Sequence, residues 1–274
     1  MALYLSEEDI DGLLTVEDAL EAVEGSFARL AEGVVENVPR RRLRLDGGAL
    51  AVMSAADLGL GVAGVKTYAA GRGGASFVLV LFDASTDELL ALIEADRIGQ
   101  YRTGAATGVA AKFLAREGAT GVGVIGAGGQ AEMQLRAVRA AVPSIERALV
   151  YSPTPERRER FAGEHGALVC AAGANRPQAR ELDNAVLQRA AFVCCDSIEG
   201  AKIESGDLIE PVAQGVLDWL EVHELQEVVS GQVQGRQSPD DIVVFKSNGI
   251  AAWDLAIGAV AVERARERGI GREL

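Results

Sequence analysis

A glycine-rich turn joins an apolar segment at 121–125, typical of a strand buried on both faces, to a segment with helical periodicity. Gly126, Gly128 and Ala131 give the pattern G-x-G-x-x-A. The first glycine permits a sharp turn, the second lets backbone N–H groups approach a pyrophosphate, and the alanine lets strand and helix pack closely. The helix N-terminus adds positive potential for phosphates. The sequence predicts dinucleotide binding here; the alternative is a tight connection that holds no ligand.

The end of the next predicted strand, at 148–152, indicates which dinucleotide would bind. An acidic residue at this point would hold the ribose 2′-hydroxyl of NAD(H). The chain instead has Ser152, Thr154 and Arg157. Hydroxyl and guanidinium groups suit a 2′-phosphate, so the sequence favours NADP(H), with NAD(H) as the alternative. Arginines are also common at the surface of a helix start.

Cations interrupt several segments nearer the N-terminus. Lys66 stands within an apolar predicted strand at 61–70, where burial is costly unless the ammonium meets an anion. The alternative is a stem that extends to the sheet edge. Arg102 lies among small residues of a predicted helix at 96–117, which leaves space for a bound group. The arginines of 40–44 are either the solvated face of a strand or include one that clamps a substrate carboxylate.

Composition excludes several classes of protein. The chain of 274 residues has 27 Lys and Arg against 40 Asp and Glu, a net charge of −13, which argues against nucleic-acid and anionic-membrane surfaces. No apolar run approaches the ~20 residues of a membrane span, and the acidic start does not resemble a signal peptide. Three cysteines in apolar runs are typical of buried thiols in a reducing cytoplasm. Two histidines and these cysteines do not have metal-ligand spacing, so we expect no metal site.

The elements that must position these residues fall into two groups. Thr15 and Asp18 form a capping box at the start of an amphipathic helix that Gly33 ends. Apolar segments separated by Gly- and Asp-rich turns predict an antiparallel meander. Strands and helices then alternate after the glycine-rich turn, and a long helix closes the chain. The predicted meander strands are 49–55, 61–70, 76–83 and 89–95, and the closing helix is 249–268.

An ordered series of motifs makes the chain similar to the ornithine cyclodeaminase/mu-crystallin family through nearly its whole length. The motifs are PRR at 39–41, VKT at 65–67, LFD at 81–83, RTGA at 102–105, GAGGQ at 126–130, GANRP at 173–177, RELD at 180–183, ESGD at 204–207 and FKSNG at 245–249.

This resemblance implies an α/β fold of two domains. A Rossmann-type nucleotide domain, apparently shortened, would occupy 116–248. It would be inserted in a discontinuous α+β domain of 1–115 and 249–274, which binds the substrate and forms a homodimer.

The resemblance also implies roles for individual residues. Arg41 and Lys66 would grip the substrate carboxylate, and Arg102 would lie between substrate and cofactor with Ser76 and Thr103 beside it. Ser247, at the start of the last helix, would lie near a ligand or would cap the helix. The cofactor turn would comprise Gly126, Ala127, Gly128, Gly129 and Gln130.

Two departures from the family pattern bear on function. Cyclodeaminases have an acid/base aspartate where this chain has Asn175, and an amide cannot shuttle a proton at neutral pH. The family also has tens of residues between the strand near Ala167 and the segment at 173–177. Either the nucleotide domain is truncated, so that the run 167–174 slides in beside the strand at 121–126, or the sequence is interrupted there.

These observations favour an NAD(P)H-dependent reductase of small, cyclic imino acids, or a related amino-acid dehydrogenase. Hydride would pass to the α-carbon, Lys66 or a water would supply a proton, and Asn175 would orient the amine or the cofactor amide. The alternatives are an ornithine cyclodeaminase-like ammonia lyase and a non-catalytic, mu-crystallin-like protein that binds NADPH and a small ligand.

Overall fold

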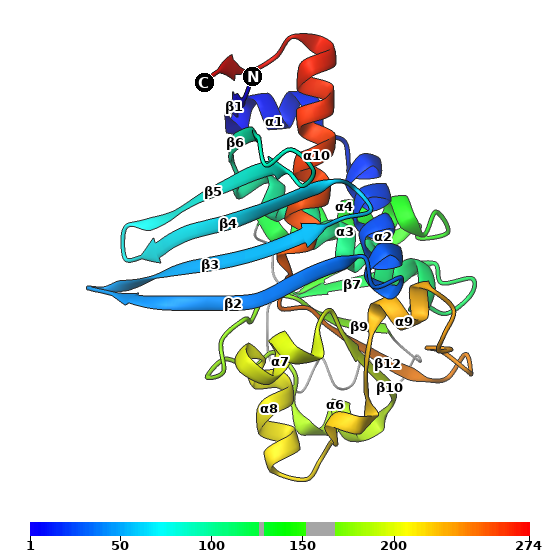
Figure 1. The fold of residues 1–274 in the computed structure, drawn as a ribbon. Coiled ribbons are helices and arrows are strands. Elements are labelled where there is room, and N and C mark those ends of the chain that lie inside the picture. The colour runs from blue at the N-terminus through cyan, green and yellow to red at the C-terminus, as the bar shows by residue number, and fades with distance from the viewer. Residues whose placement is uncertain (126–128, 152–167) are drawn as a thin grey trace. The chain divides into compact units, whose positions relative to one another are not determined.

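The computed structural model describes residues 1–125, 129–151 and 168–274, which form two compact units (Figure 1). The first unit comprises 1–102 and 250–274, and the second comprises 103–249. We expected the first boundary after residue 115, but the division falls inside a continuous helix. The start of that helix is tied to the first unit, because Asp96 and Arg97 donate their backbone N–H groups to the Glu7 carboxylate.

The first unit is a seven-stranded sheet with helices. The sheet has the order β13-β1-β6-β5-β4-β3-β2; β1 and β6 are parallel and the other neighbours are antiparallel. The four strands of the predicted meander are β3 to β6. The elements are β1 (Leu3–Leu5), α1 (Glu7–Leu13), α2 (Val16–Ala31), β2 (Val35–Leu45), β3 (Gly48–Asp57), β4 (Val62–Gly71), β5 (Gly74–Asp83), β6 (Leu89–Glu94), the start of α3 (Asp96–Leu114), α10 (Ala251–Arg268) and β13 (Arg272–Glu273).

Helix α10 packs on one face of this sheet and also contacts α2 (Figure 1). Alternate strand residues such as Met53, Leu79 and Ile93 are buried, as expected for a sheet with one covered face. Gly258 permits the close approach, since a Cβ there would lie 2.7 Å from a methyl group of Leu79. The closing helix therefore completes a core that the N-terminal strands begin.

The predicted capping box of α2 is confirmed. Thr15 donates its backbone N–H to the Asp18 carboxylate over 2.8 Å, and Asp18 donates its N–H to Thr15 Oγ1 over 3.2 Å. Asp18 also forms an ion pair with Arg264 of α10. The acid near the start of α2 thus also joins this helix to α10, the last helix of the unit.

The second unit contains two separate parallel sheets in its described residues, β7-β8 and β11-β10-β12-β9. The segment 197–235, in which sequence periodicity predicts no helix or strand, contains three short helices, a 3₁₀ turn and a strand. The elements are the rest of α3, β7 (Gly121–Ile125), α4 (Gly129–Ala141), β8 (Arg147–Tyr151), β9 (Leu168–Ala171), α6 (Asn184–Arg189), β10 (Ala190–Cys195), α7 (Ile198–Glu204), α8 (Gly206–Ala213), η1 (Trp219–Glu221), β11 (Val222–Glu224), α9 (Leu225–Val229) and β12 (Ile242–Lys246).

The second unit has two separate sheets in its described residues, where a Rossmann-type domain has one. The family pattern has additional residues between the strand near Ala167 and the segment 173–177, and this chain lacks them. Strand β9 pairs with β12, and β7 pairs with β8; among the described residues no ladder joins β7 to β9. The expectation that 167–174 slides in beside 121–126 is therefore wrong as regards strand pairing. The two segments still share an apolar cluster, to which Leu168 and Val122 both contribute.

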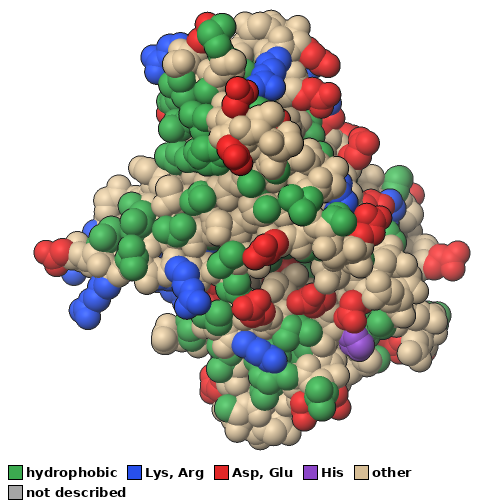
Figure 2. All heavy atoms as spheres, in the orientation of Figure 1, with side chains coloured by type: hydrophobic (Ala, Val, Ile, Leu, Met, Phe, Trp, Pro, Cys, Tyr) green, Lys and Arg blue, Asp and Glu red, His purple; other side chains and the backbone are tan. Residues whose placement is uncertain are grey.

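The cysteines, the surface charges and the helices of the described residues can be compared with what the composition predicts. All three cysteines are free, and burial raises the pKa of the Cys170 thiol to about 12. On the face in Figure 2, the basic side chains of the described residues are scattered between acidic ones and form no large patch. None of the helices in the described ranges has the length and apolar character needed to cross a membrane.

Candidate active site

Lys66 is buried in the first unit and forms an ion pair. Its side chain is 2% exposed, and Nζ donates to Oδ1 of Asp254 on α10 over 2.6 Å. The ammonium also lies 5.6 Å from the centre of the Phe77 ring. The buried ammonium therefore meets an anion of the chain itself, and its stem does not reach the sheet edge. A substrate role for Lys66 remains a prediction.

Two arginines accompany this pair. Arg102 Nε lies 3.7 Å from the same Asp254 oxygen, with 14% of its side chain exposed. Arg40 is 4% exposed and donates from Nε to the Met53 sulfur over 3.2 Å. Met53 pairs with Lys66 across the β3–β4 ladder, so Arg40 and Lys66 lie on the same face of the sheet.

Arg41, the arginine that we expected beside Lys66, lies on the other face. It is exposed and pairs with Val52, whose side chain points away from the face that carries Met53 and Lys66. The cause is a register irregularity in β2 between Val38 and Arg41, which changes the alternation that the sequence pattern assumes. Arg40 is therefore the arginine of β2 that accompanies Lys66.

Burial and neighbouring charges act on the Lys66 ammonium in opposite directions. Burial lowers its pKa most strongly, and Arg102 and Arg40 lower it further by repulsion. Asp254 raises the pKa through its charge and its hydrogen bond. The cluster thus contains a lysine that gives up a proton more readily than an exposed one.

Ser76 and Thr103, which we expect beside Arg102, do not lie with Lys66 in the buried cluster. Ser76 is exposed and pairs with Ala69, on the face of β4–β5 opposite Lys66. Thr103 is buried at the start of the second unit, and its carbonyl accepts the hydroxyl of Thr107 over 3.3 Å. Their cofactor roles remain predictions.

In the second unit, the turn that carries Asn175 is fixed from two sides. Gly173 and Ala174 each donate a backbone N–H to Glu181 over 2.9 Å. The buried Lys246 donates to the Ala174 carbonyl over 2.6 Å and contacts the Asp207 carboxylate at 3.0 Å. Asn175, half-buried, therefore sits on a rigid support. Sequence reasoning missed Lys246, although it is the one charge in the apolar strand IVVFK.

Ser247 has a structural partner. Its hydroxyl donates to Asp196 over 3.0 Å, and the same carboxylate oxygen accepts the N–H groups of Asn248 and Gly249. Asp196 follows β10, and these bonds fix residues 247–249 directly after β12 within the second unit. The expectation that Ser247 caps the last helix is wrong, because the N-cap of α10 is Ile250 and no side chain caps that end. Contact of Ser247 with a ligand remains a prediction.

The structure describes the strand before residues 126–128 of the glycine-rich motif and the helix after them. Strand β7 is parallel to β8, and α4 begins at Gly129 and Gln130, both exposed. The order strand β7, helix α4, strand β8, with an exposed helix start, fits the pyrophosphate of a dinucleotide. Six predicted cofactor residues lie outside the described residues: Gly126, Ala127, Gly128, Ser152, Thr154 and Arg157.

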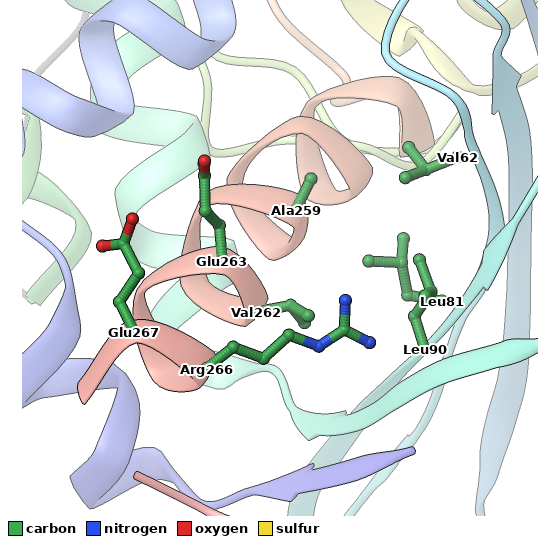
Figure 3. Close-up of a pocket in the computed structure, with 8 residues that line it drawn as sticks. All are labelled: Val62, Leu81, Leu90, Ala259, Val262, Glu263, Arg266 and Glu267. Carbon is green, nitrogen blue, oxygen red and sulfur yellow. The ribbon is translucent and has the colours of Figure 1, made fainter. Parts of the chain in front are cut away.

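An apolar groove elsewhere in the first unit is separate from the cation cluster. It has a volume of about 300 Å³ and lies between α10 and the sheet, with Val62, Leu81 and Val262 in its lining (Figure 3). Lys66 and Asp254 are not part of this lining. The described residues also contain no cluster of His, Cys, Asp and Glu that could hold a metal ion.

A mostly antiparallel-sheet unit interrupted in sequence by a parallel α/β unit that contains β7, α4 and β8 defines a two-domain α/β protein of the Rossmann-insertion type. The chain belongs to the ornithine cyclodeaminase/mu-crystallin family, whose model matches residues 2–165 and 163–269. The two matched segments meet inside the stretch 152–167.

Similar proteins have related names. Alanine dehydrogenase of Archaeoglobus fulgidus is 30% identical over 318 residues, covering 99% of this chain and 98% of that protein. Δ1-pyrroline-2-carboxylate reductase of Bacillus cereus is 32% identical over 239 residues, covering 72% and 73%. The structure of the Thermococcus litoralis Δ1-pyrroline-2-carboxylate reductase with NADH and L-proline has a TM-score of 0.90 at 30% identity, covering 99% of this chain and all of that one.

The lengths of the aligned proteins help to explain why the second unit has two separate sheets. The alignment with the Archaeoglobus protein extends over 318 positions, whereas this chain has 274 residues. The relative therefore contains residues without a counterpart here. A shortened α/β unit, with β7 and β9 in separate sheets, is consistent with such a loss.

Proposed function

We propose that this protein is an NAD(P)H-dependent reductase of small imino acids, or a related amino-acid dehydrogenase in the reverse direction. The observation that carries the proposal is the buried cluster in which Arg40 and Arg102 accompany Lys66. Cations on a mostly apolar face suit a substrate carboxylate, which guanidinium groups bind through paired hydrogen bonds. The relatives named above act on alanine or on pyrroline-2-carboxylate, both carboxylate-bearing.

The chemistry divides between cofactor and protein. The nicotinamide supplies the hydride, which adds to the α-carbon of a C=N bond, and the nitrogen takes up a proton to give the amine. Arg40 and Arg102 hold the carboxylate, and Lys66 shares this grip and donates the proton. Because burial and the repulsion of Arg102 and Arg40 lower its pKa more than Asp254 raises it, the Lys66 ammonium is a stronger acid than a solvated lysine.

Asn175 orients the amine nitrogen or the nicotinamide amide in this proposal. Its support is the turn held by Glu181 and Lys246. An amide donates and accepts hydrogen bonds but does not exchange protons at neutral pH, which disfavours ammonia elimination.

A nicotinamide cofactor is supported by family membership and by the NADH in the Thermococcus structure. We further propose a preference for NADP(H), because Ser152, Thr154 and Arg157 follow β8 where an acid would select NAD(H). Comparison of kcat/KM for NADPH and NADH tests this preference, and a higher value for NADH would overturn it.

We also propose a homodimer. Leu43 and Leu45 are 59% and 44% exposed on the sheet face opposite Lys66, where apolar surface suits a partner. Light scattering after size exclusion should give twice the chain mass, and a monomer would contradict this proposal.

The principal test is a set of three assays on the full chain. Oxidation of NADPH that requires pyrroline-2-carboxylate supports the reductase. Ammonia release from ornithine without net cofactor change would instead indicate the lyase. NADPH binding without turnover of cyclic or acyclic imino acids would indicate a binding protein.

A further inference from the structure

Asp254 has no role in the proposal so far, although it lies at the centre of the cation cluster. It is fully buried on α10, and its Oδ1 atom accepts the hydrogen bond from Lys66 Nζ over 2.6 Å. Arg102 Nε lies 3.7 Å from the same atom. Oδ2 is also buried and has no hydrogen-bond partner among the described residues.

A buried ion pair of this kind calls for a functional explanation. Removing two charges from water costs about as much as their attraction returns, and apolar residues of similar volume often stabilise a protein more. A lysine side chain also has four rotatable bonds, so its ammonium takes one position only when something holds it. Among the described residues of α10, Asp254 holds the Lys66 ammonium through its carboxylate.

The space around Nζ restricts the ammonium further. A Cβ on Gly99 would lie 3.0 Å from it, and the Phe77 ring centre lies 5.6 Å away. Helix α3, strand β5 and helix α10 therefore confine the ammonium together.

We propose that Asp254 is a positioning residue of the reaction, which holds Lys66 Nζ through Oδ1 so that its remaining N–H groups face the substrate. This inference rests on the proposed function. It adds a carboxylate from the far end of the chain to the set of residues on which proton donation depends.

Removal of the Asp254 charge has a predictable effect on Lys66. The charged groups that act on the ammonium are Asp254 from α10, Arg102 from α3 and Arg40 from β2. Asp254 is the one among these that raises the pKa, so its neutralisation lowers the Lys66 pKa further. Since the ammonium must be protonated to act as acid, the basic limb of the pH profile then moves to lower pH.

The test compares Asp254→Asn with Glu263→Gln, which removes an exposed carboxylate from the same helix. With NADPH and pyrroline-2-carboxylate, we expect Asp254→Asn to lower kcat at least about tenfold and to shift the basic limb of kcat/KM to lower pH. Glu263→Gln should behave as the wild type, and Asp254→Glu should restore part of the loss. A uniform loss of activity with an unshifted pH profile would overturn the proposal.

A double-mutant cycle with Lys66→Met decides whether Asp254 acts through Lys66. The Lys66→Met/Asp254→Asn variant removes both buried charges, so it should fold even where Asp254→Asn does not. We expect its activity to match that of Lys66→Met within about twofold, because two residues that act as a unit are not additive. A further loss equal to that of Asp254→Asn alone would overturn the proposal.

A measurement without turnover separates this inference from the proposed function. In protein with ¹³C-labelled lysine side chains, the Lys66 signal is identified by its absence in Lys66→Met and is titrated by NMR. A lower pKa in Asp254→Asn than in Glu263→Gln supports the pairing even when no imine is reduced. An equal pKa in the two variants overturns it, whatever the activity.

Discussion

Arg40 and Met53 contact each other across the β2–β3 ladder, with Arg40 Nε 3.2 Å from Met53 Sδ. Since Met53 pairs with Lys66 on the next strand, this contact places the Arg40 guanidinium over the face that carries the lysine. Arg41, one residue later, points to the opposite face. Two adjacent arginines therefore lie on opposite faces of the sheet.

Replacement of these arginines one at a time should distinguish them. Arg40→Ala removes a proposed partner of the substrate carboxylate, and we expect KM for the imino acid to rise about tenfold or more, about 1.4 kcal/mol of binding. Arg41→Ala should leave KM within about twofold, because its side chain is exposed on the other face. Steady-state kinetics measure both. A larger rise in KM for Arg41→Ala than for Arg40→Ala would indicate that Arg41 binds the substrate carboxylate.

Replacement of Lys66 should separate catalysis from cofactor binding. Lys66→Ala removes the proposed proton donor, and kcat/KM should fall by about 10² to 10⁴. The variant should also lose about 3–5 kcal/mol of unfolding free energy, because Asp254 is left buried without its ammonium. NADPH affinity by fluorescence titration should not change, since the nucleotide-binding elements belong to the other unit. Unchanged turnover would remove Lys66 from the mechanism.

A small change next to Lys66 should act without removing any charge. Gly99→Ala places a methyl group 3.0 Å from Nζ, which must move by a few tenths of an ångström. We expect kcat to fall about tenfold, because a proton donor works only in a narrow geometry. Gly12→Ala is the matched control, since a Cβ there meets no atom within 4 Å. Equal kcat in both variants would show that the Lys66 position tolerates such a shift.

The separation of β7 and β8 from the other strands of the second unit should affect the rates of amide hydrogen exchange. Strand β7 has one described ladder neighbour, whereas β10 and β12 each have two. Amides of 121–125 should therefore exchange faster than those of 242–246, because their local opening costs less free energy. Saturating NADPH should slow the exchange in β7 and leave β12 unaffected. Equal protection of both strands without cofactor would contradict this prediction.

The turn after β5 should respond to acid. Asp83 accepts hydrogen bonds from the hydroxyl and N–H of Ser85 and from the N–H of Thr86, which lower the pKa of its carboxyl group to about 2. A depressed pKa contributes stability above the ordinary value, and this contribution is lost as the pH falls toward about 2. The urea midpoint of Asp83→Asn should therefore lie below that of the wild type near pH 6 and approach it near pH 2.5. A constant difference would exclude the carboxylate as its source.

Local patterns predicted much of the fold. Alternation of apolar residues and Gly- and Asp-rich turns sufficed for β3 to β6, and the capping box sufficed for the start of α2. The short helices of 197–235 were missed because each has fewer than nine residues, too short for a periodicity to be recognised.

The candidate site was predicted in part. Lys66 could be found because a charge in an apolar strand is rare. Arg40 could not be distinguished from Arg41, because the register irregularity of β2 reverses the alternation locally. Asp254 was missed despite a similar signal: it is the one charge within residues 251–262, so two isolated opposite charges in apolar elements could have been paired.

The separation of the Lys66–Asp254 pair along the chain has a consequence for biosynthesis. The two residues are 188 positions apart, because the whole second unit lies between them. At about 5–20 residues per second, a ribosome needs about 10–40 s to reach the aspartate after it has made the lysine. During that interval the nascent sheet has an ammonium without its counterion and a face without its covering helix. Folding of the first unit must therefore await the last part of translation.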